Sequence, residues 1–471
     1  MAITSPGLAS GIDIQGIVSK LVALERQPLV PLQQQAASFQ SKLSVFGTIN
    51  GMVSALGDAA SKLTQTSAWT GVRGTTTSDA VGISAQAGTT PTSMSVEVQA
   101  LARAQTTASA TILSGTAVGS GTLTIQLGGW SGTTFTPGTA AAVNVSVVAG
   151  DTLTDIARKI NEGRAGVNAT VLRDGTGERL LVRANDTGVS RAFQITATDD
   201  DGIPRDANGL SRLAYASNAG TMHGMSLTQA AVNAQATVNN VPITSESNSV
   251  SNALPGITLT LNKLTTAPVE VGVQQDRDNI RKNLQTFVDA YNALNNMLAT
   301  STRFDPDTKV AGSLQGDSTA VGLQNALRRM MGSVTPGGEF ERLSDIGITM
   351  QRGGALTIDN AKLDRAMANP AALQRLFANS STVATEQGFG QKVKAFADGM
   401  INSGGAVTSR TESLRNAISR NAKEQDKLNE RVSRAEARYL AQYNAMDAAV
   451  GRLSGLNAFV SQQVTLWNNQ K

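Results

Sequence analysis

Several residue types are missing or scarce in this chain of 471 residues, and each shortage excludes a class of protein. Cysteine is absent, which excludes disulfides and cysteine-ligated metals. His223 is the only histidine, so neither a cluster of histidine ligands nor a Ser-His-Asp set has support. Aromatic residues make up 4% of the chain, too few for a base-stacking platform. No run of about 18 apolar residues occurs, so no membrane insertion is expected.

Charge and the first residues limit the partners further. Charged residues make up 16% of the chain and the net charge is +4, spread along the sequence, so nucleic acid is not an expected partner. The opening MAITSPGLASGIDIQ lacks the basic and hydrophobic regions of a Sec signal peptide. With no cysteine, this fits either the cytosol or export without oxidative folding. A chain of this length has room for two to four domains.

The last 60 or so residues carry a sustained heptad pattern of apolar residues. Its seam consists of apolar positions and four uncharged amides: Leu414, Ile418, Asn421, Gln425, Leu428, Val432, Ala435, Tyr439, Gln442, Met446, Ala449, Leu453, Leu456, Val460, Gln463 and Trp467. A capping box at Ser409 and Glu412 predicts where this helix begins. At 1.5 Å per residue the helix would be roughly 80 Å long. Its apolar stripe needs a partner from this chain or from another copy.

The other end of the chain offers such a partner. Ile17, Leu21 and Leu24 form one stripe, and a second stripe after it includes Leu43 and Phe46. Pro28 and Pro31 stand between the two stripes and predict a break in the helix. Both ends of the chain are therefore predicted to be amphipathic helices.

The middle of the chain alternates apolar and polar residues and predicts strands. The clearest strand patterns lie at 93–99, 121–127, 142–148, 168–172, 179–183, 236–241, 257–261 and 269–273. One helix interrupts them, where Thr152 and Asp155 form a capping box. Helical periodicity returns after Asp276, with helices near 280–298, 317–332, 360–378 and 385–402.

The order of helix, strands and helix predicts an α+β multidomain protein, with β-rich domains inserted between helical regions built from both chain ends. Four domains are expected, with the inner β boundary left open. They are a coiled-coil leg domain (1–40 and 409–471), a helical bundle domain (41–72 and 276–408), a β-rich domain (75–105 and 227–275) and an outer β-rich domain (106–226).

No residue pattern in this sequence predicts a catalytic, cofactor-binding or metal site. Asp199, Asp200 and Asp201 lack the spaced oxygen ligands and terminal Glu of a calcium loop and are interpreted as a solvated turn. Asp305-Pro306-Asp307 is interpreted as a turn too. Neither a dinucleotide-binding glycine pattern nor a Walker A pattern is present. A structural or assembly protein is therefore expected rather than an enzyme.

Several blocks resemble one family. Ser10-Gly11-Ile12-Asp13-Ile14, followed by Ile17-Val18-Ser19-Lys20-Leu21, resembles the N-terminal signature of the bacterial flagellar filament-capping family, hook-associated protein 2. Further blocks are similar to the family's in order: 98–105, the flagellin and hook "IN" motif at 151–169, Phe287-Val-Asp-Ala-Tyr291-Asn292, 312–317, 343–348, 354–359 and 376–377. One departure is Asn240, where the family usually has Gly. It is expected to change only a turn, because Asn tolerates a positive φ.

The resemblance implies a function and a set of partners. It implies a secreted cap at the distal tip of the flagellar filament that directs incoming flagellin into place. The seams of the terminal helices, from Ile17 to Phe46 and from Leu414 to Val460, are then the predicted interface with other subunits or with the filament. The implied partners are further copies of the chain in a ring of five, flagellin, the hook-filament junction proteins, and a type III export chaperone at the C-terminal region. The sequence by itself does not distinguish five subunits from four or six.

Three alternatives remain at this stage. A surface adhesin would bind host mucin or glycan through its β-rich domains, but it would not need the terminal helices. An enzyme would need a site that the sequence does not reveal. Flagellin itself shares the IN motif, but the blocks at 287–377 favour the capping family.

Overall fold

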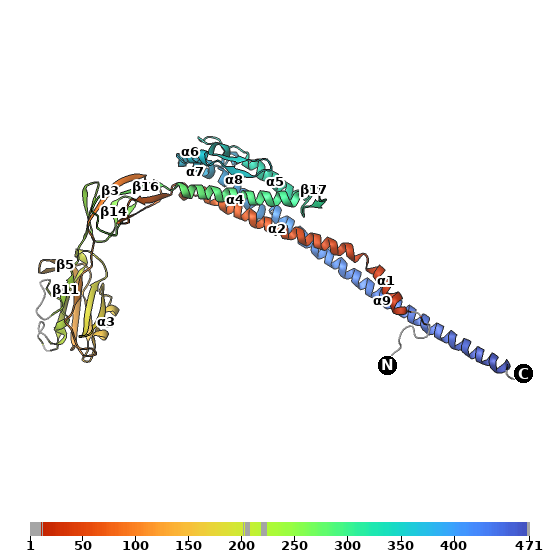
Figure 1. Ribbon diagram of the computed structural model, residues 1–471, viewed down its shortest axis with the longest axis horizontal. Helices are drawn as coiled ribbons and strands as arrows, with labels where there is room; N and C mark the ends of the chain where they lie inside the picture. Colours follow the sequence, from red (N-terminus) through yellow and green to blue (C-terminus); the bar gives the residue numbers. More distant parts are fainter. Residues whose placement is uncertain (1–10, 12, 201, 203–207, 218–223, 469–471) are drawn as a thin grey trace. The chain divides into compact units, whose positions relative to one another are not determined.

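The computed structural model describes residues 11, 13–200, 202, 208–217 and 224–468, and the chain divides into two compact units. A helical unit combines 1–69 with 278–471, and a β unit comprises 70–277. This mixture of terminal helices and inserted β-rich parts is the predicted fold class (Figure 1). In the described ranges no helix is both long enough and apolar enough to cross a bilayer.

The helical unit is assembled from both ends of the chain. Its helices are α1 (Ile14–Arg26), α2 (Leu29–Thr64), α4 (Arg277–Thr302), α5 (Ser318–Met331), α6 (Asn360–Ala366), α7 (Pro370–Ala378), α8 (Phe389–Ile401) and α9 (Ala406–Asn468). Two small hairpins join them: β17 (Phe304–Asp305) with β18 (Val310–Ala311), and β19 (Ile348–Met350) with β20 (Leu356–Ile358). Figure 1 shows α2 and then α1 following α9, which continues alone past α1.

Proline and capping residues set several helix ends. The predicted break at Pro28 is confirmed, since α1 ends at Arg26 and Pro28 is the N-cap of α2. Pro31 falls in the first turn of α2, where a missing N–H costs nothing. The single helix expected near 360–378 is two helices, because Asn369 caps a new helix that begins at Pro370.

The expected start of the last helix at Ser409 was wrong. Helix α9 begins at Ala406, directly after the turn at Gly404, whose φ is +89°. The backbone N–H of Ser409 already donates to the Gly405 carbonyl at 2.8 Å, so this residue is inside the first turn. Helix α8 ends at Ile401, and the chain turns at Gly404 and Gly405 before α9 begins, earlier than the Ser409 and Glu412 pattern predicted.

The described helices of the bundle share a large apolar core. It is formed by helices α2, α4 to α8 and the first turns of α9, and its fully buried members include Trp69, Phe377 and Phe389. The Trp69 and Phe377 rings stack with centroids 5.4 Å apart. Such aromatic packing supplies much of the apolar burial that stabilises a bundle.

Eight strands in the first and last parts of the β unit form an inner pair of sheets. They are β1 (Val72–Thr76), β2 (Val81–Ala85), β3 (Thr92–Ala100), β12 (Ala234–Val238), β13 (Val241–Ser245), β14 (Ser249–Leu254), β15 (Ile257–Leu261) and β16 (Val269–Gln275). One sheet has the order β1-β16-β3-β12-β13 and the other β14-β15-β2. In the β12–β13 turn, Asn239 and Asn240 have φ of 48° and 66°. The expectation that Asn240 tolerates a positive φ is confirmed.

The intervening residues form an outer pair of sheets with one helix. Their strands are β4 (Thr106–Ala108), β5 (Gly121–Ser131), β6 (Thr134–Pro137), β7 (Val143–Val147), β8 (Val167–Asp174), β9 (Gly177–Ala184), β10 (Ala192–Asp199) and β11 (Ser226–Gln229). One sheet has the order β10-β5-β6 with β7 on β5, and the other β11-β4-β9-β8. Helix α3 (Leu153–Glu162) begins with the predicted capping box of Thr152 and Asp155.

Four separate apolar clusters occur among the described residues, one in the leg, one in the bundle and two in the β unit. They support the predicted division into four domains, which stays a prediction. Strand β11 pairs with β4 of the outer sheet and runs past the expected boundary at 226. The outer domain therefore extends to Gln229 in this structure.

Candidate assembly interface in the terminal helices

The distal part of the leg is a small apolar cluster between α1 and α9. Ile14, Val18 and Val22 are buried there against Val432, and Tyr439, Leu440 and Tyr443 are half-buried beside them. Asp13 begins α1 by accepting a hydrogen bond from the Gly16 N–H at 2.8 Å. The leg helices thus pair within one chain, as the apolar stripes at both ends predict.

The face of α1 that contacts α9 differs from the predicted stripe. Ile17 and Leu21 are only half-buried, and Leu24 is 59% exposed. The contact uses Ile14, Val18 and Val22 instead, which follow one another at intervals of four residues on one helix face. The predicted stripe lies beside this face, where part of it remains accessible to another molecule.

Polar contacts at the edge of this cluster hold the two helices in register. The Glu25 carboxylate forms an ion pair with Arg431 at 3.3 Å and accepts a hydrogen bond from the Tyr439 hydroxyl at 3.3 Å. Sequence reasoning placed Tyr439 in the seam and missed its polar contact, because a heptad pattern contains no information on pairing between distant segments.

A layer of amides separates the leg cluster from the bundle core. Asn421 is 5% exposed and donates to the Gln35 side-chain oxygen at 3.0 Å, while its own oxygen accepts from Gln425 at 2.7 Å. Ile418 and Leu428 flank the layer and are half-buried. A polar residue in a helix seam fixes register at some cost in stability, so this layer aligns α2 with α9.

The first turns of α9 are fixed in the bundle. Phe46 and Leu414, both predicted interface residues, lie inside the bundle core, and Leu43 packs against that core. Arg410 forms an ion pair with the buried Asp317 carboxylate at 2.8 Å. Asp317 also caps α5 by accepting from the Thr319 N–H at 3.0 Å. Phe46 and Leu414 are therefore buried within the bundle and are not accessible to a partner.

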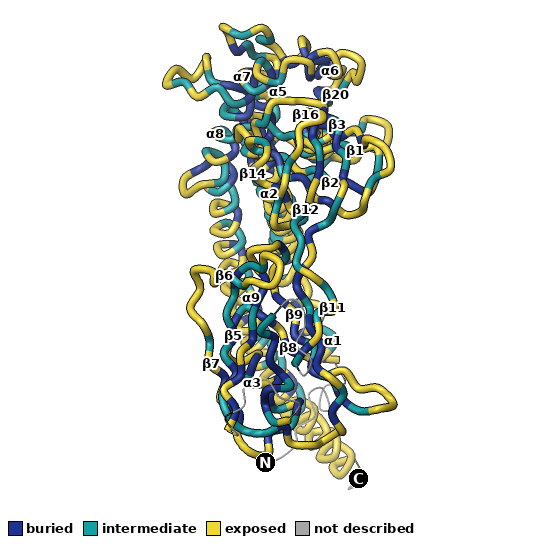
Figure 2. The backbone as a smooth tube through the Cα atoms, turned by 90° about the vertical axis from the view of Figure 1, so that its left-hand side faces the viewer, coloured by how far each residue is buried: buried dark blue, intermediate teal, exposed yellow. Residues whose placement is uncertain are grey.

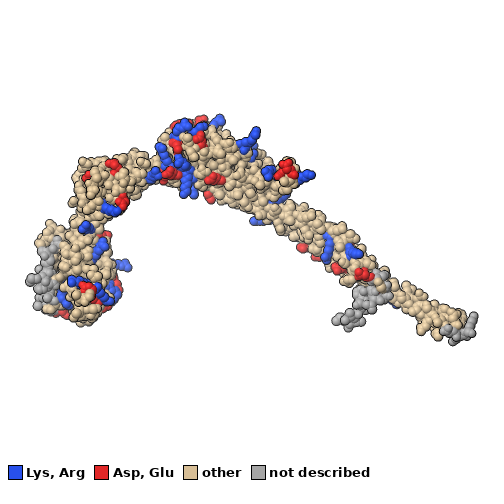
Figure 3. Space-filling view, in the orientation of Figure 1, with Lys and Arg blue, Asp and Glu red and all other residues tan. Residues whose placement is uncertain are grey.

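From Arg452 to Asn468, every residue of α9 is exposed. Met446, Leu453 and Val460, three predicted interface residues, are 38%, 67% and 49% exposed. The same end exposes five more large apolar residues: Leu456, Phe459, Val464, Leu466 and Trp467. Figure 2 shows this end as exposed, and Figure 3 shows it nearly free of charged side chains. This stretch is the strongest candidate for a contact with another molecule.

The helix motif at 287–292 has a structural role in the bundle. Phe287 and Tyr291 are fully buried, and burial raises the pKa of Tyr291. The Asn292 side chain donates to the Leu356 carbonyl at 2.8 Å and accepts from the Leu356 N–H at 2.7 Å. It thereby fixes the β19–β20 hairpin on α4, a contact that the motif alone did not predict.

The IN motif contains a similar amide clamp in the β unit. Asn161, at the end of α3, donates to the Ala169 carbonyl at 2.9 Å and accepts from the Ala169 N–H at 2.8 Å. The helix is thereby attached to β8. A hydrogen bond from Lys159, followed by one from the Val148 N–H, lowers the pKa of Asp151 at the other end of the motif. These residues stabilise the outer domain.

Two of the remaining polar candidates, Asp199 and Asp305, have structural contacts in the described part of the chain. His223 and Asp201 lie outside the described residues. Asp199 is buried rather than solvated, and its carboxylate accepts from the Ser211 N–H at 2.8 Å. Asp305 accepts from the Asp307 N–H at 3.0 Å, which confirms the turn. Within the described ranges, no three His, Cys, Asp or Glu residues are placed to hold a metal ion.

Comparison with known proteins gives one consistent family. Residues 10–105 match the family described as flagellar hook-associated protein 2 N-terminus, residues 231–455 match its C-terminus, and residues 122–186 match the flagellin hook IN motif. Flagellar hook-associated protein 2 of Escherichia coli strain K12 is 28% identical over all of both chains. A-type flagellar hook-associated protein 2 of Pseudomonas aeruginosa is 28% identical over 98% of this chain and 97% of its own length.

The fold comparison agrees with the sequence comparison. The chain is similar to the crystal structure of the D1-D2-D3 domains of the flagellar cap protein FliD from Escherichia coli, with a TM-score of 0.62 and 27% identity. The similarity covers 79% of this chain and 99% of that one. The N-terminal, IN and C-terminal matches follow one another in the order that sequence reasoning expected. The chain therefore belongs to the flagellar hook-associated protein 2 family.

Proposed function

We propose that this chain is a structural cap at the distal end of the flagellar filament, where it promotes and directs the assembly of flagellin subunits. The similar Escherichia coli structure is described as a flagellar cap protein. The observation that carries the proposal is the exposed, uncharged apolar end of α9, from Leu453 to Trp467. An apolar helix end of this kind is suited to insertion between other helices and not to water.

The proposed arrangement of the cap is a closed ring of copies of this chain, with five subunits on the filament. A contact between two different surfaces of one chain generates a ring when the rotation between neighbours closes. Leu24, Met446, Leu453 and Val460 are exposed predicted interface residues and are available for contacts with flagellin or with other copies. The ring is proposed to bind first to the hook-filament junction proteins.

The proposed route to the tip is secretion through the flagellum's own type III channel. A type III export chaperone is proposed to cover the C-terminal region before export, because exposed apolar helix ends promote aggregation. The role is proposed to be structural and not catalytic. The names of the relatives describe no adhesion, so the adhesin alternative is not proposed.

A motility assay tests the capping role with two matched aspartate variants. In a bacterium whose own cap gene is deleted, the wild-type chain is expected to restore filaments, and Leu453→Asp is expected not to. Leu453 is 67% exposed, so the charge leaves the chain's own core intact while opposing burial against a partner. The readouts are filament length by microscopy and unpolymerised flagellin in the medium.

Lys427→Asp is the control, since Lys427 is exposed and lies off the seam, paired with Glu424 at 3.0 Å. Normal swimming is expected for this variant. Normal filaments with Leu453→Asp, together with lost filaments for Lys427→Asp, would contradict the role given to the terminal helix.

A further inference from the structure

An open groove lies between the C-terminal end of α5 and the start of α8. It has a volume of about 620 Å³. Two cations line it, Arg329 and Lys392, and we call it the cationic groove. The rest of its lining is mainly apolar and includes Met330, Val334, Pro336 and Ala384. Apolar walls with a few charged groups, at this volume, are typical of binding sites.

Hydrogen bonds between and within two loops hold the groove in shape. The Thr335 hydroxyl donates to the Gln387 carbonyl at 3.0 Å and so joins the loop after α5 to the loop before α8. The second loop is closed on itself, because the Asn379 side chain donates to the Glu386 carbonyl at 2.6 Å and the Gln387 side chain donates to the Ser381 carbonyl at 2.9 Å. The groove is therefore preformed, which lowers the cost of ordering it when a ligand binds.

Lys392 is held in this groove at an energetic cost. Its amine donates to the Val334 carbonyl at 3.0 Å and to the Thr335 hydroxyl at 3.1 Å, and it lies 5.3 Å from the centroid of the Phe389 ring. No carboxylate in the described part of the chain forms an ion pair with it. Lys392 lies in the first turn of α8, where the helix dipole disfavours a cation. Burial lowers the pKa of its amine. A bound anion would offset both costs.

Arg329 supplies a second cation from the last turn of α5. It is exposed, and no described residue forms a hydrogen bond or an ion pair with its side chain. Two acids of the adjoining loops make contacts of their own: Glu341 accepts from the Gly337 N–H at 3.0 Å, and Glu386 accepts from the Ser381 hydroxyl at 2.9 Å. A groove with two cations and no paired carboxylate attracts an anionic group.

We propose that the cationic groove binds a segment of a partner protein in which an apolar side chain stands next to an aspartate or a glutamate. The apolar side chain packs on Met330 and Val334. The carboxylate pairs with Lys392 and with Arg329, whose guanidinium can hold it through two parallel hydrogen bonds.

The surroundings of the groove favour an extended segment over a small molecule. Val383, the residue before Ala384, is 49% exposed, so apolar surface continues along the chain beyond the groove itself. A peptide covers both surfaces, whereas a small carboxylate covers only the groove. The site belongs to the bundle and does not rest on the proposed capping function.

Calorimetry with the purified full-length chain tests the proposal with two blocked peptides. The probe is acetyl-Gly-Leu-Asp-Leu-Gly-amide, and the uncharged control has Asn in place of Asp. The probe is expected to bind at least ten times more tightly than the control, because only its carboxylate can pair with the two cations. Equal affinities for the two peptides would overturn the proposal.

Three matched variants locate the site. Arg329→Gln and Lys392→Gln are each expected to weaken binding of the probe at least fivefold. Lys394→Gln is the control, since it removes the same charge from the same helix, but Lys394 pairs with Asp398 at 2.7 Å and does not line the groove. Arg329 is exposed and has no described contact to lose, so its variant reports on binding and not on folding. An Arg329→Gln protein that binds the probe as the wild type does would overturn the proposal.

Lysine acetylation gives an independent measurement. The chain is treated with acetic anhydride, with and without saturating probe peptide, and the sites are followed by mass spectrometry. The probe is expected to slow acetylation of Lys392 at least threefold and to leave Lys394 unchanged. Equal slowing at both lysines would overturn the proposal. Self-association of the chain that Arg329→Gln abolishes in sedimentation would also overturn it, because the occupant would then be a second copy.

Discussion

The two halves of α9 carry the same heptad pattern in different surroundings. Between Leu414 and Tyr439, the seam packs on the bundle core, on the amide layer of α2 and on α1. Between Leu453 and Trp467, the seam continues with every residue exposed, and Trp467 is 79% exposed. A heptad pattern therefore predicts that a helix needs a partner, but not whether the partner is in the same molecule.

The surrounding charges distinguish the two halves more clearly than the seam does. The first half carries mixed charge, including Arg431 and Glu424, and is suited to a helix with one face in water. The stretch after Arg452 has no charge up to Asn468 and is apolar on several faces. A helix that is apolar on several faces is suited to being surrounded, so its partner contacts are expected to be more extensive than those of the first half.

The largest expected effect comes from a charge in the packed half. Val432 is 3% exposed among Ile14, Val18 and Val22. Val432→Asp is expected to destabilise the α1–α9 pairing by about 3 to 5 kcal/mol, since an unpaired carboxylate would be buried. Hydrogen exchange should then show fast exchange of amides in residues 14–26. Unchanged protection of these amides would show that the leg pairing does not form in solution.

A somewhat smaller effect is expected where α9 is joined to the bundle. Asp317→Ala removes the N-cap of α5 and leaves Arg410 unpaired, so the unfolding free energy should fall by about 2 to 3 kcal/mol. Asp359→Ala is the control, because Asp359 caps α6 in the same way from an exposed position, and it should cost only about 1 kcal/mol. Equal losses in a urea titration would argue against the ion pair as an anchor.

A change in the β unit tests whether both halves of α9 are independent of it. Asp151→Asn removes the partner of Lys159 and should lower the stability of the β unit by about 1 to 2 kcal/mol at pH 7. The folded pKa of Asp151 is lowered. Its contribution is therefore present above the unfolded pKa of about 3.9 and is lost as the pH falls through the folded pKa.

The wild-type β unit should thus lose this stabilisation in acid, whereas the variant lacks it at every pH. Melting curves from pH 7 to pH 2 measure the difference, which should shrink below about pH 4. Hydrogen exchange in α9 should be the same in both proteins. An altered exchange of α9 in the variant would show that the two units are coupled.

An increase in stability is expected at the amide layer. Asn421→Leu replaces a polar residue in the seam and should stabilise the α2–α9 pairing by about 1 kcal/mol while weakening the selection of register. Thermal unfolding measures the first effect. Cross-links between cysteines placed one helical turn apart on either helix measure the second. A lower melting temperature would mean that the Gln35 and Gln425 contacts outweigh apolar packing here.

The smallest effect is expected in the free half. Val460→Asp is the same substitution as Val432→Asp at an equivalent seam position, but Val460 is 49% exposed. The unfolding free energy of dilute protein should therefore change by less than about 0.5 kcal/mol. A large loss in dilute protein would show that the end of α9 packs within its own molecule, and the contrast between the two halves would be lost.

Much of the architecture follows from local sequence. The break at Pro28, the capping box at Thr152 and Asp155, and the turn at Asn240 were predicted from residues that act on their own backbone neighbours. The face of α1 that contacts α9 was not predicted. Helix α1 has two neighbouring apolar stripes, of which only one was proposed, and only the partner helix decides which of them is buried.

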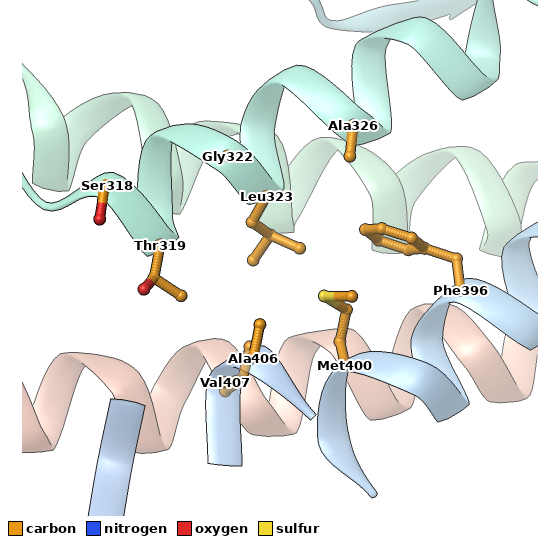
Figure 4. Close-up of a pocket in the computed structure, with 9 residues that line it drawn as sticks. All are labelled: Ser318, Thr319, Gly322, Leu323, Ala326, Phe396, Met400, Ala406 and Val407. Carbon is orange, nitrogen blue, oxygen red and sulfur yellow. The ribbon is translucent and has the colours of Figure 1, made fainter. Parts of the chain in front are cut away.

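The contacts between residues that are distant in the sequence were not predicted either. The Asp317–Arg410 ion pair and the Asn292–Leu356 clamp join segments that lie far apart in the chain, and no spacing rule connects them. A small apolar groove between α5 and α8, with Leu323 and Phe396 on opposite sides, is also formed by separate helices (Figure 4). The exposed end of α9 could be identified from its sequence because apolar character and the lack of charge are local properties.

The bundle core has a consequence for the order in which the molecule can form. It needs residues on both sides of the β unit, from Phe46 to Trp69 and from Ile280 to Leu414. In a chain that emerges N-terminus first, the continuous β unit at 70–277 can fold before α8 and α9 have emerged. Helix α2 can pack against α8 and α9 only after that. Contacts across such a sequence separation form slowly, because a long loop must be closed. The helical unit is therefore the last part of the chain to fold, because its core is complete only when most of the chain has emerged.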